Sequence, residues 1–184
     1  STGFRVATAE DNASYWSIAT TMRSDSKALS TVKDALGLGS ATVDVAYTAI
    51  NSAIDVTSEI KSKLVAAREP GIDRAKVQGE IKELQNQLKS VGDSAVFSGQ
   101  NWLSVDSAAT NYNASKSIVA SFTRDSSGGV SINTISVDTS SIKLYDSSAS
   151  GVGIIDGLRG STGAIGASGA SVASLDISAL TDRA

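Results

Sequence analysis

The side chains best suited to chemistry are three aspartates, Asp138, Asp146 and Asp156, in the second half of a 184-residue chain. Carboxylate oxygens are the ligands that Ca²⁺ prefers, so the three could surround one ion. They do not follow the closely spaced D-x-[DN]-x-[DN]-G pattern that preorganises a calcium loop. Aspartates at strand ends and in turns usually accept local backbone hydrogen bonds, and we favour that interpretation.

A glycine-rich tract offers the second chemical possibility. Gly151-Val152-Gly153 is followed by Gly157 and Gly160, which superficially resembles a phosphate-binding loop. The spacing does not match the dinucleotide fingerprint, no GK[ST] element is present, and no helix-forming segment clearly follows. The tract therefore favours a surface loop.

Acid–base and nucleophilic catalysis have few residues to draw on. The chain contains no His and no Cys, which excludes Ser-His-Asp triads, thiolate nucleophiles, disulfides and imidazole or thiolate metal sites. A pair of carboxylates for glycoside hydrolysis would need a cleft, and only three Phe, two Trp and four Tyr are available to line one. The sequence predicts neither an enzyme nor a cofactor.

Composition and charge also limit the partners. The content of hydrophobic residues is 41%, enough for a core built mainly from Ala, Val, Ile and Leu. The net charge is −3 with basic residues scattered among acidic ones, so neither nucleic acid nor an anionic membrane is a favoured partner. No stretch of roughly 18 apolar residues predicts membrane insertion.

The elements that would position any site begin with a helical first half. Two rows of residues repeat every seven positions, as the a and d positions of a heptad do. The first row is apolar except at Thr57, and small residues dominate the middle of the second. The first row is Tyr15, Met22, Leu29, Leu36, Val43, Ile50, Thr57 and Leu64, and the second is Ile18, Asp25, Val32, Gly39, Ala46, Ala53, Ile60 and Ala67.

The heptad register continues through Gly37 and Gly39, which predicts one long helix rather than two. Pro70-Gly71 ends it, because the residue before proline is pushed out of the helical region. A second helix is expected from the N-cap Asp73 to Val91.

The apolar residues of this second helix step by four, three, four and three, and its Lys, Glu and Gln leave the other face to water. The predicted packing seam of the antiparallel helical hairpin comprises Tyr15, Ile18, Met22, Leu29, Val32, Leu36, Val43, Ile50, Ile60, Leu64, Val77, Ile81, Leu84, Leu88 and Val91. The longer first helix keeps spare apolar surface around Tyr15 to Leu36, which another helix or subunit must cover.

From about Ser94 the chain becomes rich in Ser, Thr and Gly and alternates like a β-strand. A hairpin is expected from Ile118–Thr123 and Val130–Ile132, with further strands at Ile135–Val137, Ile142–Tyr145 and Leu175–Ser178. The fold class is α+β: a long helical hairpin or bundle followed by a small β-rich outer domain. We predict a helical core domain with a small β-hairpin over residues 1–103, a variable outer domain over 104–174 and a return strand over 175–184.

Between the two halves, Phe97-Ser98-Gly99-Gln100-Asn101-Trp102-Leu103 forms a short turn segment after the second helix. Phe97 and Trp102 flank the Ser-Gly-Gln-Asn turn. We expect these two aromatic residues to anchor a small β element onto the helices.

Two separate motifs resemble those of bacterial flagellins, and those of α-proteobacterial type most. The opening STGFRVATAEDNASYWSIATTMRSD is similar to the segment that enters the flagellin helical core, and FSGQNWL stands where flagellins carry a hairpin after the second core helix. The resemblance covers Ser1 to about Leu103. Its matching positions in the first motif are Ser1, Thr2, Gly3, Arg5, Ala9, Asp11, Ala13 and Ile18.

The resemblance implies an extracellular filament subunit that gives motility and packs against other copies of itself. It also implies an export chaperone and a filament cap as partners. Flagellins continue into helical segments at both ends, so the resemblance suggests a core fragment without the two terminal helical segments.

Two alternatives remain beside the filament subunit. A flagellin-like surface adhesin could bind polysaccharide or a host surface through Ser, Thr and Asn of residues 111–150, which is the only glycan contact considered. A hook-junction protein of the same superfamily would share the helices.

Overall fold

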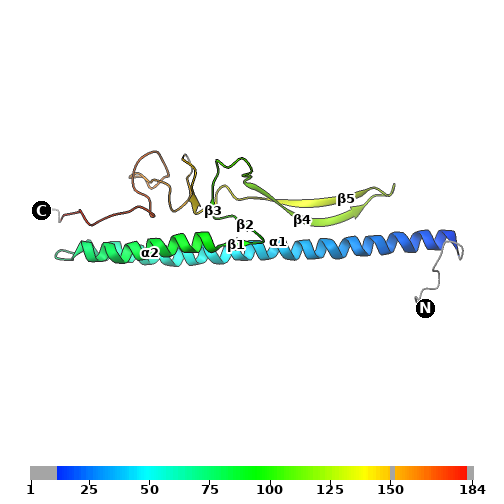
Figure 1. Cartoon of the computed structure of the whole chain (residues 1–184), viewed down its shortest axis with the longest axis horizontal. Helices are drawn as coiled ribbons and strands as arrows, with labels where there is room; N and C mark the ends of the chain where they lie inside the picture. Colours follow the sequence, from blue (N-terminus) through cyan, green and yellow to red (C-terminus); the bar gives the residue numbers. More distant parts are fainter. Residues whose placement is uncertain (1–11, 150–151, 182–184) are drawn as a thin grey trace. The chain divides into compact units, whose positions relative to one another are not determined.

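The computed structural model describes residues 12–149 and 152–181 (Figure 1). The flagellin-like motif positions from Ser1 to Asp11 lie outside these residues. The described part contains a long helix, a shorter helix and a set of short strands, which is the α+β class expected from the sequence.

The first helix, α1 (Ala13–Ala66), has 54 residues and runs without a break through both internal glycines. It begins where Asn12 Oδ1 accepts a hydrogen bond from the Tyr15 amide at 3.2 Å, which satisfies one of the unpaired amides of a helix start. The prediction of a single long helix is confirmed.

The second helix, α2 (Arg74–Ser94), follows the loop that contains Pro70. The Asp73 side chain accepts hydrogen bonds from the amides of Ala75 and Lys76, so the predicted N-cap is confirmed. An ion pair of 2.6 Å joins Lys63 of α1 to Glu80 of α2, and Arg74 Nε donates to the carbonyl of Ala67 at 3.1 Å.

A short hairpin closes the end of α2. Strands β1 (Val96–Phe97) and β2 (Gln100–Asn101) pair antiparallel around Ser98 and Gly99, which have φ angles of 50° and 74°. Two successive positive φ angles match the right-handed twist of a two-residue hairpin. The strand β3 (Ser104–Val105) then pairs in parallel with β6 (Tyr145–Asp146).

The chain divides into two compact units. One combines residues up to Ser40 with Ser117–Val137, and the other combines Ala41–Lys116 with residues from Asp138 onward. The first unit holds most of the hairpin of β4 (Ser115–Arg124) and β5 (Val130–Asp138). This hairpin was predicted, although β5 absorbs the separate strand expected at Ile135–Val137.

Within the first unit, β4 packs on α1. A Cβ added at Gly39 would lie 2.3 Å from Cγ2 of Ile118, so the strand occupies the space that the glycine leaves. Further along, the Arg124 guanidinium binds the Asp25 carboxylate at 2.6 Å. The burial of Val32 follows from this cover.

Two strand predictions are wrong. In the strand expected at Ile142–Tyr145, residues 142–144 form no strand, and only Tyr145 belongs to β6. Leu175–Ser178 forms no strand, because its backbone bonds to side chains of α2 rather than to a neighbouring strand. Residues 182–184 of the expected return strand lie outside the described residues.

Candidate interaction surfaces on the helices

The buried apolar side chains are both small and branched on α1, and all large on α2. Ala53 and Ile60 are buried on α1, and Ile81 and Leu88 are fully buried on α2. Alanine lets a facing helix approach closely, so the branched side chains of α2 fill the space along it. This helix pair forms the core of the second unit.

The buried stripe of α1 follows the second row rather than lying between the two rows. Five members of the second row, Val32, Ala46, Ala53, Ile60 and Ala67, are buried. Val56, which belongs to neither row, is also buried. The first row is rotated about 60° from the second around the helix, because each residue turns the helix by about 100°.

The first row is therefore largely uncovered. In the first unit Tyr15 and Met22 are each 67% exposed, and Leu29 is 53% exposed. Leu36 of the same row and Ile18 of the second row are exposed too. Each such side chain leaves roughly 1.5–3 kcal/mol of burial unrealised, scaled by its exposed fraction.

In the second unit the uncovered side of α1 carries residues that the heptad pattern did not select. Tyr47 and Ile54 are exposed beside Val43 of the first row. Both lie four residues after members of the first row, so each is a neighbour of such a member on the helix surface. A search for apolar residues at this spacing would have found them. Ile54 also lines an apolar groove of about 420 Å³ with Leu144 and Ile154.

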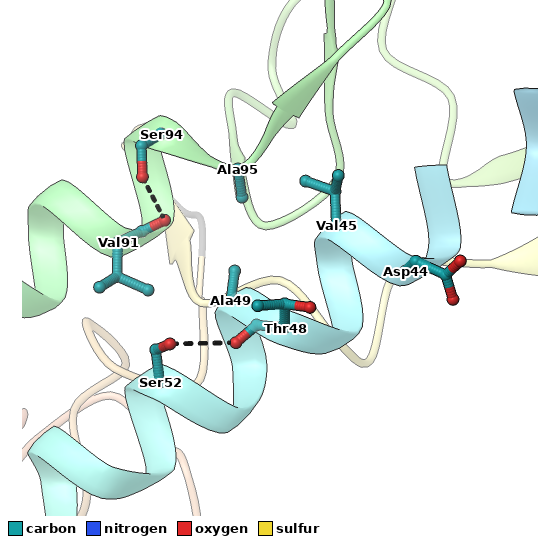
Figure 2. A pocket seen from close by; sticks show the side chains of 8 residues that line it. All are labelled: Asp44, Val45, Thr48, Ala49, Ser52, Val91, Ser94 and Ala95. Carbon is teal, nitrogen blue, oxygen red and sulfur yellow. Dashed lines mark hydrogen bonds between the residues drawn. The ribbon is translucent and has the colours of Figure 1, made fainter. Parts of the chain in front are cut away.

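A second groove lies between α1 and the end of α2 (Figure 2). Two of its hydroxyls bond to carbonyls of their own helices: Ser52 donates to the Thr48 carbonyl and Ser94 to the Val91 carbonyl. The Asp44 side chain points away from the other labelled residues. The apolar walls are left to Val45, Ala49, Val91 and Ala95.

The predicted seam and anchors thus fall into three classes of exposure. The role of each as a packing residue stays a prediction. Val32, Ile60, Ile81, Leu84, Leu88 and Trp102 are buried, Ile50, Leu64, Val77, Val91 and Phe97 are half-buried, and Tyr15, Ile18, Met22, Leu29, Leu36 and Val43 are exposed.

Asn101 organises the turn segment after α2. Its Nδ2 donates to the carbonyls of Gly92 and Asp93, and its Oδ1 accepts from the amides of Leu103 and Ser104. One side chain therefore satisfies carbonyls at the end of the helix and amides of the next segment. Phe97 and Trp102 were predicted as the anchors of this segment, whereas the role of Asn101 was not predicted.

The three aspartates that could have surrounded a cation accept hydrogen bonds from nearby backbone amides. Asp156 Oδ2 accepts from the Asp146 amide at 2.8 Å, and its Oδ1 accepts from the Gly153 amide at 2.6 Å. Asp138 Oδ1 accepts from the Ser140 amide. Across residues 12–149 and 152–181, no group of three acidic side chains is placed to hold a metal ion.

The glycine tract is occupied in the same way. A Cβ at Gly153 would lie 2.3 Å from the Leu144 carbonyl oxygen, and the Gly153 amide already points at a carboxylate. A phosphate would meet that negative charge, so this segment is built for close backbone packing.

Asp146 is the most deeply buried charge described. Burial alone would raise its pKa, but the ammonium of Lys143 at 2.5 Å and hydrogen bonds from Ser107 and Ser148 hold the pKa well below its usual range. Beside it, burial raises the pKa of Tyr145 to about 12, with Asp156 and Asp93 adding to the effect.

These features are those of a protein that packs through its helices and that leaves one apolar row of its long helix uncovered. The family profile described as the bacterial flagellin N-terminal helical region matches residues 1–108. This chain belongs to the flagellin family.

Curated relatives agree with that assignment. The chain is 56% identical over 146 residues to Flagellin C of Rhizobium meliloti, a match that covers 79% of this chain and 45% of that protein. It is 53% identical to Flagellin A of the same species, over 85% of this chain and 39% of the other. A flagellin of Brucella melitensis is 41% identical over 81% of this chain and 49% of its own length.

The chain thus spans less than half the length of these relatives. Among the residues that the structure describes, no helix has the apolar length needed to cross a membrane.

Proposed function

We propose that this chain is the helical part of a structural subunit of the extracellular flagellar filament, and that it packs against other copies of itself. The single observation that carries this is the uncovered first row of α1: four large apolar side chains from Tyr15 to Leu36 recur at one heptad position and stay exposed. Family membership supplies the kind of partner, a second copy.

The experiment places a charge on the uncovered row. Leu29→Asp in the gene product that carries this chain should abolish long filaments in electron micrographs and motility in soft agar. A buried carboxylate without a partner is strongly unfavourable at an interface. The circular dichroism of the purified protein should not change, because Leu29 is exposed within the chain.

Lys27→Asp is the matched control. Lys27 is exposed on α1 and lies outside both rows, and its substitution introduces the same aspartate side chain. Its filaments should form normally. If Leu29→Asp assembles as well as Lys27→Asp does, the first row is not the contact.

The division into domains over 1–103, 104–174 and 175–184 stays a prediction, as do the export chaperone and the filament cap. The two compact units cut the chain differently, since residues 104–116 and those from Asp138 onward belong with α2. The adhesin alternative finds no support, because the relatives named above are all flagellins. No catalytic role is proposed.

A further inference from the structure

Two glutamines of α2, Gln78 and Gln85, lie on the helix face that the sequence pattern predicted to face solvent. Gln78 and Gln85 are seven residues apart, or two helical turns, so they share one face of the helix. Gln85 is only 5% exposed and Gln78 is half-buried. A buried carboxamide needs partners for both its donor and its acceptor, which makes its hydrogen bonds informative.

The partners belong to the backbone of one segment, residues 171–177. Gln85 Nε2 donates to the carbonyls of Val172 at 2.9 Å and Leu175 at 3.0 Å. Gln78 Nε2 donates to the same Leu175 carbonyl at 3.1 Å, and its Oε1 accepts from the Ile177 amide at 2.9 Å. The Gln78 carboxamide thus engages the carbonyl before Asp176 and the amide after it, as a neighbouring β-strand would.

One side chain at each end of the segment is buried. Ile177 is 5% exposed and lines a groove with Leu64 of α1 and with Ala67 and Pro70 of the loop that follows α1. At the other end Ser171 is 4% exposed, and its hydroxyl bonds to that of Ser174 at 2.7 Å. Asp176, between them, points its carboxylate to its own chain, where it accepts from the Ser178 amide.

We propose that this face of α2 is a peptide-docking site that recognises the backbone of a turn and of the three residues after it, and that its occupant is the chain's own segment Ser171–Ile177. The two carboxamides form hydrogen bonds with two carbonyls and one amide of the bound segment, and the apolar groove accommodates an aliphatic side chain at position 177. The side chain at position 176 makes no hydrogen bond to α2, and its carboxylate feels only the charge of the exposed Lys82. The inference does not depend on filament assembly, because every contact lies within one chain.

Hydrogen exchange of the full chain tests the carboxamides. Gln85→Glu replaces two donors by a carboxylate facing two carbonyls, so exchange of the amides of residues 172–177 should accelerate at least tenfold. Gln87→Glu is the control, since Gln87 is exposed on the same helix, and it should leave this exchange unchanged. Amides in the middle of α2 should stay protected in both variants.

If Gln85→Glu unfolds the whole chain, Gln78→Met decides, because it removes one carboxamide without adding charge. It should accelerate exchange of the Ile177 amide several-fold. Unchanged exchange in the variant that folds overturns the proposal, as does equal acceleration by Gln87→Glu.

Binding in trans tests the site as a site. Ile177→Ala in the full chain should weaken the occupant, and a fluorescent peptide of residues 170–181 should then bind, as measured by anisotropy. Adding Gln85→Glu to that chain should weaken peptide binding at least tenfold. A peptide carrying Asp176→Ala should bind as the natural sequence does, and one carrying Ile177→Ala should not. Binding that ignores Gln85 would refute the docking site.

Discussion

Two isoleucines of α1 offer a test of which helix face the chain buries. Ile60 is 2% exposed and Ile54 is 57% exposed, although both belong to the same helix and the same unit. Replacing Ile by Ala removes carbon groups worth about 2.4 kcal/mol when fully buried. A cavity at position 60 adds to this, so Ile60→Ala should cost about 3 kcal/mol.

At position 54 less than half of the transfer free energy is realised, about 1 kcal/mol, and the better helix propensity of Ala returns about 0.4 kcal/mol. Ile54→Ala should therefore cost about 0.6 kcal/mol. Urea unfolding of the purified chain, followed by far-ultraviolet circular dichroism and by tryptophan fluorescence, measures both values. Trp102 reports on the second unit, where it is buried. Equal losses for the two variants would refute the assignment of the buried face.

Three further perturbations probe single contacts. Gly37→Ala should raise the melting temperature through about 1 kcal/mol of helix propensity, since a Cβ there meets nothing within 4 Å. Gly39→Ala should lower the melting temperature, because Ile118 fills the space that a Cβ would take. Equal shifts for the two variants would contradict the packing of β4 on α1. The pKa of Asp146 is depressed in the folded state, so its ionised form stabilises the fold above the unfolded-state pKa of about 4, and this stabilisation is lost as the pH falls further. Asp146→Asn should therefore be about 3 kcal/mol less stable at pH 7 and should lose less stability than the wild type in an acid titration. An acid titration that matches the wild-type profile would count against this role of Asp146. Asn101→Ala removes four hydrogen bonds at the end of α2 and should cost about 2–3 kcal/mol in urea unfolding, and a loss under 0.5 kcal/mol would show that the cap is dispensable.

Much of the helical half follows from local chemistry. The uninterrupted heptad register outweighs the cost of two glycines, the Asp73 side chain can cap only from the position before the helix, and Pro70 stops what precedes it. The β4–β5 hairpin likewise follows from alternation around a glycine-bearing turn. These signals lie within a few residues of the structures that they specify.

The errors share a different cause. A heptad pattern shows that two rows are apolar, but the choice of the row buried within the chain depends on what packs there, and β4 is distant in sequence. Leu175–Ser178 was predicted as a strand because its apolar and polar residues alternate. Its hydrogen-bond partners turned out to be side chains of α2, about a hundred residues earlier.

The glutamines show why polarity alone misassigns a helix face. A helical wheel counts Gln as solvent-facing because an amide without partners is costly to bury, yet the cost disappears when the amide meets a backbone that also lacks partners. A segment that pairs with no neighbouring strand carries such unpaired carbonyls and amides. Gln85 and residues 172–177 therefore resolve each other's unmet hydrogen bonds, and neither would be stable when buried alone. The burial of polar residues on α2 and the absence of a strand at Leu175–Ser178 therefore have the same cause: the backbone of that segment bonds to glutamine side chains.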